Sequence, residues 1–188
     1  MGHSDALRLP VVSLAAEHLT IGQLMRRNIL TYKAPPNNEG YDLICIHPDP
    51  RTPSKQVRVQ VKSRYQTDCD RAFPVKPSTF DAFDYLVVVF LNIGYFYRKR
   101  VSLSGRTTPE FFTLPRAFVA KHHYLPKSGF GRVLTKRLDL SPFKDELGFE
   151  QIAEALRIPY PARAGAVSNS RLQRSAAGAS SAPEDQAC

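Results

Sequence analysis

The feature that most restricts the fold is an uninterrupted apolar segment, YLVVVFLN, at residues 85–92. A run of this length without alternating polar residues is typical of a strand that is covered on both faces. Such strands lie in the middle of mixed or parallel sheets. The short polar segment 77–84 directly before the run is expected to form a helical crossover, which a parallel connection requires. The sequence therefore predicts an α/β fold.

An amphipathic helix is expected over residues 14–27, with Ser13 as its N-cap. Leu14, Ile21 and Met25 recur at helical spacing, with Ala15 and Leu24 close by, and this face is predicted to pack against the core. The two arginines that end the segment are expected to point outward.

Three strands are predicted between this helix and the apolar run, at residues 29–34, 41–47 and 56–64. The loop between the last two is rich in proline and polar residues, as a hairpin connection should be. In the third strand valines alternate with polar residues, so Gln60 and Lys62 are expected to leave the same face of the sheet.

The C-terminal half contains weaker patterns. Residues 95–101 suggest an edge strand, and residues 114–123 suggest a short helix. A last helical region is expected from a cap at Ser141 to Ile158, with a break at Gly148. From residue 161 onward the chain has almost no large apolar residues and is predicted to be a disordered tail, so that residues 1–160 form the domain.

The charge of the chain points to a polyanionic partner. Its 188 residues include 26 Lys+Arg and 17 Asp+Glu, which gives a net charge of +9. Such a field attracts nucleic acid, although many small basic proteins bind nothing specific.

The cysteines and the apolar segments indicate the cellular compartment in which the protein is expected. Cys45, Cys69 and Cys188 are an odd number at no metal-binding spacing, which predicts neither a disulfide framework nor a zinc site and favours a reducing cytoplasm. The N-terminal segment lacks the apolar core of a signal peptide, and the longest apolar stretch is too short to cross a membrane. We therefore expect a soluble, cytoplasmic protein with no membrane partner.

A candidate active site is formed by Asp42, Gln60 and Lys62. If the strands that carry them pair as a hairpin, a carboxylate, an amide oxygen and an ammonium converge. A hard cation such as Mg²⁺ prefers oxygen ligands, here Asp42, Gln60 and the backbone carbonyl of Val61. A bound metal activates water and neutralises charge on phosphate, and Lys62 would stabilise that charge or orient the water. The alternative is that Gln60 and Lys62 belong to an ordinary solvated strand face.

This pattern resembles the PD-(D/E)XK nuclease superfamily, in which a helix bearing a Glu precedes an Asp in one strand and (Asp/Glu/Gln)-x-Lys in the next. Here Glu17 stands in LAAEHL, Asp42 in GYDLIC, and Gln60 and Lys62 in VRVQVKSR. The resemblance covers roughly residues 14–97 and is strongest to short stand-alone members. It implies a restriction-endonuclease-like α-β-β-β-α-β core with a mixed central sheet flanked by helices, cleavage of DNA with Mg²⁺ or Mn²⁺, and Glu17 as an added metal or water ligand.

The sequence departs from that pattern at two positions. Tyr41 stands where the family has Pro, a mild change, and Gln60 replaces the usual acid, which removes a negative charge and should weaken metal binding. Glu17 is nearly as well explained as a surface residue, with Glu39 as a substitute ligand. The histidines, among them His47, are expected to be surface or partly buried residues rather than metal ligands.

Two functions follow from the resemblance. The first is a metal-dependent DNA endonuclease, which as a homodimer would cut both strands of a duplex. The second is a non-catalytic DNA-binding module, or a subunit of a complex, that keeps the nuclease fold.

Overall fold

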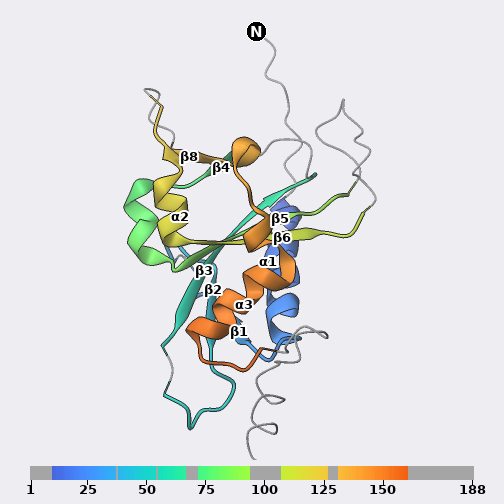
Figure 1. Ribbon diagram of the computed structural model, residues 1–188, viewed down its shortest axis with the longest axis vertical. Coiled ribbons are helices and arrows are strands. Elements are labelled where there is room, and N and C mark those ends of the chain that lie inside the picture. The colour runs from blue at the N-terminus through green and yellow to red at the C-terminus, as the bar shows by residue number, and fades with distance from the viewer. Residues whose placement is uncertain are drawn as a thin grey trace, which may run out of the picture.

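A five-stranded mixed sheet forms the centre of the protein (Figure 1). The computed structural model describes residues 10–36, 38–53, 55–66, 72–93, 107–126 and 131–160. In spatial order the strands are β1 (Leu30–Lys33), β2 (Leu43–Ile46), β3 (Val57–Arg64), β5 (Tyr85–Phe90) and β6 (Glu110–Pro115). Strands β3 and β5 run parallel, and the other neighbours are antiparallel. The predicted α/β class with a mixed central sheet is therefore confirmed.

The apolar run forms β5, which lies between β3 and β6. Its residues from Leu86 to Phe90 are all buried, as the absence of alternation predicted. The segment before it forms η1 (Pro77–Ala82), a 3-10 helix, so the helical crossover is also confirmed. The crossover contains in addition the short strand β4 (Ala72–Pro74), which the sequence analysis did not anticipate.

Strand β4 belongs to a second, three-stranded sheet in the order β4-β8-β7, with β8 at Arg132–Leu134 and β7 at His123–Tyr124. Strands of two or three residues are too short to show a periodic pattern. The remaining short elements are η2 (Thr135–Arg137) and η3 (Ser141–Phe143).

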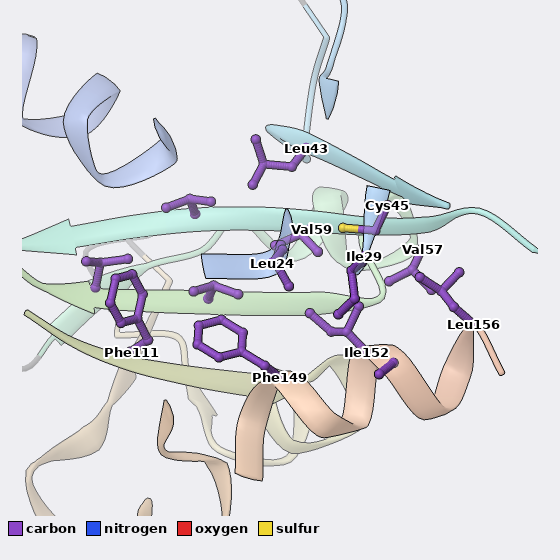
Figure 2. Packing of buried hydrophobic residues seen from close by; sticks show 14 of the residues in the cluster. Leu24, Ile29, Leu43, Cys45, Val57, Val59, Phe111, Phe149, Ile152 and Leu156 are labelled. Carbon is purple, nitrogen blue, oxygen red and sulfur yellow. The ribbon is translucent and has the colours of Figure 1, made fainter. Parts of the chain in front are cut away.

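Helices and the small sheet cover the two faces of the central sheet (Figure 1). On the first face lie α1 (Pro10–Met25) and α3 (Asp145–Ala155). Phe149 and Ile152 of α3, and Leu156 at its C-cap, point toward the sheet (Figure 2). The second face is covered by α2 (Arg116–Lys121), η1 and the small sheet. None of the described helices is long and apolar enough to span a bilayer.

The buried face of α1 differs from the predicted one. Leu14 and Met25 are 42% and 48% exposed, whereas Ala16, Thr20 and Leu24 are fully buried. The small residues allow the helix to lie close to the sheet, and the hydroxyl of Thr20 donates to the carbonyl of Ala16 at 2.8 Å, which satisfies the buried polar group. Of the residues expected on or near that face, Leu24 belongs to the core cluster and Ile21 packs against it.

The predicted N-cap of this helix and the predicted exposure of Arg27 are also wrong. The helix begins at Pro10 and includes Ser13, so Ser13 is not its N-cap. Arg27, predicted to face solvent, is buried because its guanidinium pairs with Glu146 of α3 and lies over the ring of Phe149, 4.6 Å from the centroid. A charged partner on a distant segment thus overrides the local pattern.

Two predictions for the C-terminal half differ from the structure. Part of a predicted helix is a strand, and the last helix continues through its predicted break. The helix expected at residues 114–123 is shorter, because residues up to Pro115 form β6. Ser141 begins η3, and α3 runs through Gly148 without a break. A Cβ on Gly148 would lie 2.3 Å from the carbonyl of Phe143 and 2.8 Å from the hydroxyl of Thr113. The glycine therefore permits close packing of α3 on β6. Segments 95–101 and 161–188 lie outside the described residues.

Candidate active site

Asp42 lies immediately before β2 and is held against the middle of β3. Leu43 pairs with Val59, so continuing this register by one residue brings Asp42 opposite Gln60. The backbone N–H of Asp42 donates to the carbonyl of Val59 at 2.9 Å. In return, Oδ2 of Asp42 accepts a hydrogen bond from the N–H of Val61 at 2.6 Å. These bonds fix the carboxylate and do not engage its other oxygen.

Strand β3 separates its apolar and polar side chains as predicted. Val59 and Val61 belong to the core cluster beneath α1 and α3. Gln60 and Lys62 alternate with them and therefore leave the opposite face of the sheet.

A cavity of about 710 Å³ opens on this second face. Asp42, Gln60 and Lys62 line one side of it, so the structure brings the three predicted side chains together. The lining also includes residues that the sequence did not assign to the site, among them Lys76, Ser78 and Thr79. One signal could have revealed them: the crossover from β3 to β5 must pass over a face of the sheet, and its polar residues follow β4 directly.

Gly40 allows the loop before Asp42 to approach this crossover. Its φ of 98° lies in the left-handed region that favours glycine. A Cβ at this position would also lie 2.4 Å from the Cβ of Ala82 in η1. The glycine thus brings the loop that carries Asp42 against η1 at the edge of the cavity.

Gln60 contributes a buried oxygen that has no hydrogen-bond partner among the described residues. The residue is 8% exposed, and within the described part of the chain Oε1 accepts no hydrogen bond. Burying an unpaired polar atom costs roughly 1–3 kcal/mol. An amide oxygen of this kind, beside a carboxylate, fits the ligand preference of a hard divalent cation.

The backbone carbonyl of Val61 is a third oxygen near Asp42. In an extended strand the N–H and the carbonyl of one residue point to the same side. Because the N–H of Val61 points to Asp42, its carbonyl is directed to the same side of β3. Asp42, Gln60 and Val61 are therefore a donor set that suits Mg²⁺ or Mn²⁺.

Burial and neighbouring charges perturb both ionisable groups on this side of the cavity. Burial raises the pKa of the Asp42 carboxyl, and Glu17 adds to the increase, while the Val61 N–H, Lys62 and Lys33 oppose it. Burial lowers the pKa of the Lys62 ammonium, an effect that Asp42 opposes and that Arg64 and Lys76 reinforce. Perturbed groups in one cavity are typical of functional sites.

Glu17 lies near this group but is engaged by another residue. Its carboxylate, on α1, forms an ion pair with Lys33 at 2.7 Å. It is nevertheless close enough to Asp42 to raise the pKa of that carboxyl. Glu39, the substitute considered from the sequence, is exposed and lines the cavity. A role for Glu17 as a metal or water ligand stays a prediction.

The remaining candidates have structural contacts. His47 accepts the backbone N–H of Asp49 at 3.0 Å, and His123 donates to the carbonyl of Val75 at 2.9 Å. Cys45 is buried, which raises the pKa of its thiol to about 12, as expected of an inert core residue. Across the described segments, no three His, Cys, Asp or Glu residues are grouped to hold a metal.

Comparisons with known proteins give structural similarity alone. No protein-family model and no curated protein matches the sequence. The chain is similar to the structure of a bacterial homing endonuclease, with 16% identity, a TM-score of 0.46, and coverage of 82% of this chain and 94% of that chain. It is also similar to Hjc, a Holliday junction resolvase from the archaeal hyperthermophile Archaeoglobus fulgidus, with 10% identity, a TM-score of 0.40, and coverage of 79% and 98%.

Proposed function

We propose that this protein is a metal-dependent endonuclease that hydrolyses the phosphodiester backbone of DNA. The observation that carries the proposal is the convergence of Asp42, Gln60 and Lys62 on one cavity, with Oε1 of Gln60 buried and unpaired by the described residues. A carboxylate, a free amide oxygen and an ammonium form the set that metal-assisted phosphodiester hydrolysis requires.

Asp42, Gln60 and the carbonyl of Val61 would hold the divalent cation. When bound, such a cation acidifies a water nucleophile and neutralises charge on the phosphate. Lys62 places a positive charge beside Asp42 in the same cavity, where the pentavalent phosphate would gather negative charge. Because Lys62 is partly buried, its charge is screened less by water than that of a surface lysine.

DNA is the substrate that fits the charge of the whole chain. The net charge of +9 favours association with a polyanion.

A cleavage assay tests the proposal. The parent protein and an Asp42→Asn variant would be incubated with supercoiled, linear and branched DNA in Mg²⁺, in Mn²⁺ and in EDTA. We expect metal-dependent cleavage by the parent and at least about a hundredfold slower cleavage by the variant, because the anionic ligand is lost. A parent protein that binds DNA but cuts none of these substrates with either metal would instead indicate the non-catalytic binding module.

A further inference from the structure

We propose that Lys76 is a second phosphate-binding residue of this cavity, which contacts the DNA backbone next to the scissile phosphate. The inference rests on the proposed function and extends it to another residue that lines the cavity. Lys76 comes from the segment between β4 and η1, far from the pattern formed by Asp42, Gln60 and Lys62, yet it lines the same cavity.

The backbone that carries Lys76 is firmly held. The carbonyl of Lys76 accepts hydrogen bonds from the N–H and the hydroxyl of Thr79, at 3.0 and 2.8 Å. The preceding residue, Val75, is 2% exposed and donates its N–H to the carbonyl of Gly131 at 3.1 Å. The carbonyl of Val75 accepts the Nε2–H of His123. The long side chain of Lys76 therefore starts from a fixed point, which reduces the ordering cost of a contact.

The charges of the residues that line the cavity favour binding of an anion. Two lysines of the described chain form ion pairs with an acid, Lys33 with Glu17 and Lys144 with Glu110. Lys76 has no ion pair with any described residue, and position 60, where the related pattern has an acid, is a neutral glutamine. Two ammonium groups, those of Lys62 and Lys76, thus line one cavity, and a bound phosphate would relieve their repulsion.

The neighbours of Lys76 favour a backbone phosphate over other anions. Ser78, an exposed residue with a hydroxyl donor, lines the same side of the cavity. Lysine together with serine or threonine hydroxyls is a common set for contacts to the phosphates of DNA.

The positions of the two lysines predict different roles. Lys62 is half-buried beside Asp42, whereas Lys76 is exposed. Lys62 is therefore expected to act on the reacting phosphate, and Lys76 on substrate binding. Loss of a contact made equally in the ground and transition states raises KM and leaves kcat unchanged.

The test measures DNA affinity without metal. Duplex binding would be titrated in EDTA over a range of salt concentrations for the parent, Lys76→Ala, Lys76→Arg and Lys55→Ala. Lys55 is a matched control because it lines a different cavity, beside Leu156 and Arg157. We expect Lys76→Ala to reduce the slope of log affinity against log salt by about 0.9, the share of one phosphate. The slopes for Lys76→Arg and for Lys55→Ala should both equal that of the parent.

The second part of the test measures KM and kcat for DNA cleavage in Mn²⁺. For Lys76→Ala we expect KM to rise up to about tenfold while kcat changes by less than about twofold. An unchanged slope and affinity in Lys76→Ala, or an equal reduction in Lys55→Ala, would overturn the role of Lys76. Because the binding arm contains no metal, that failure is distinct from failure of the nuclease proposal, which would appear as absence of cleavage by the parent.

Discussion

At the scale of single residues, Gln60 is the position on which the chemistry of the site depends. Its oxygen is buried and has no partner among the described residues, while one oxygen of neighbouring Asp42 already accepts the N–H of Val61. A neutral amide supplies a ligand atom without charge, so any cation would rely chiefly on Asp42 for charge neutralisation.

Replacing Gln60 with glutamate therefore tests the metal site. Gln60→Glu adds a charged ligand and should keep or strengthen Mn²⁺ binding, by on the order of tenfold, because affinity follows the charge of the ligands. Calorimetric titration with Mn²⁺ measures the change. Gln151→Glu, on α3 and away from the cavity, is the control for added charge. Equal and negligible binding by the parent and Gln60→Glu would contradict the site.

The residues of the candidate site differ in how far sequence predicts them. Gln60 and Lys62 share a face because side chains alternate along a strand, and the hairpin register then brings Asp42 to them. The pairing of Glu17 with Lys33 and the position of Lys76 depend on long-range packing. No local pattern carries that information.

At the scale of elements, an ionic cluster at the edge of the core joins the turn after α1 to α3. The guanidinium of Arg27 bonds to Glu146 and Tyr160, and also to the backbone carbonyl of Gln23 at 2.6 Å. The side chain of Arg27 is 8% exposed, whereas that of Glu146 is 59% exposed. The cluster joins the end of one helix to the first turn of the other.

This cluster predicts a pH dependence of stability. The hydrogen bond from Arg27 lowers the pKa of Glu146 to about 2, from an ordinary value of 4.5. Because the folded-state pKa is depressed, the contribution of the pair is full above pH 4.5 and is lost as the pH falls toward 2. We expect a loss on the order of 1 kcal/mol, since Glu146 is largely exposed.

Urea unfolding at a series of pH values checks this prediction. The parent should lose more unfolding free energy between pH 4.5 and pH 2 than a Glu146→Gln variant, which lacks the titrating group. Glu150→Gln, an exposed change on the same helix, should follow the parent. Superimposable pH profiles for the parent and Glu146→Gln would refute a stabilising role for the pair.

Elements with strong periodicity were predictable, and those fixed by tertiary contacts were not. The apolar strand β5 and the alternating strand β3 follow from their own residues. The inward face of α1 does not, because small residues and Arg27 occupy it. The small sheet depends on pairing between β4 and β8, which lie far apart in the sequence.

At the scale of the whole molecule, both faces of the central sheet carry a hydrophobic core cluster, and the second face also carries the cavity. The first core cluster lies beneath α1 and α3 (Figures 1 and 2). On the second face the cavity lies between β3 and the crossover, beside the second cluster. Strand β3 serves both sides, with Val59 and Val61 in the core and Gln60 and Lys62 in the cavity. The alternation of one strand thus links the stability of the fold to the geometry of the candidate site.

The central claim, that the cavity hydrolyses DNA, is tested most directly by a paired measurement on Lys62→Ala. Cleavage rate in Mn²⁺ and duplex affinity in EDTA would be measured for this variant, with Lys76→Ala for comparison. Because Lys62 is expected to stabilise charge mainly in the transition state, its loss should slow cleavage by about a hundredfold or more. Duplex affinity should change by little more than the share of one phosphate contact. A Lys62→Ala protein that cuts DNA as fast as the parent would contradict the account.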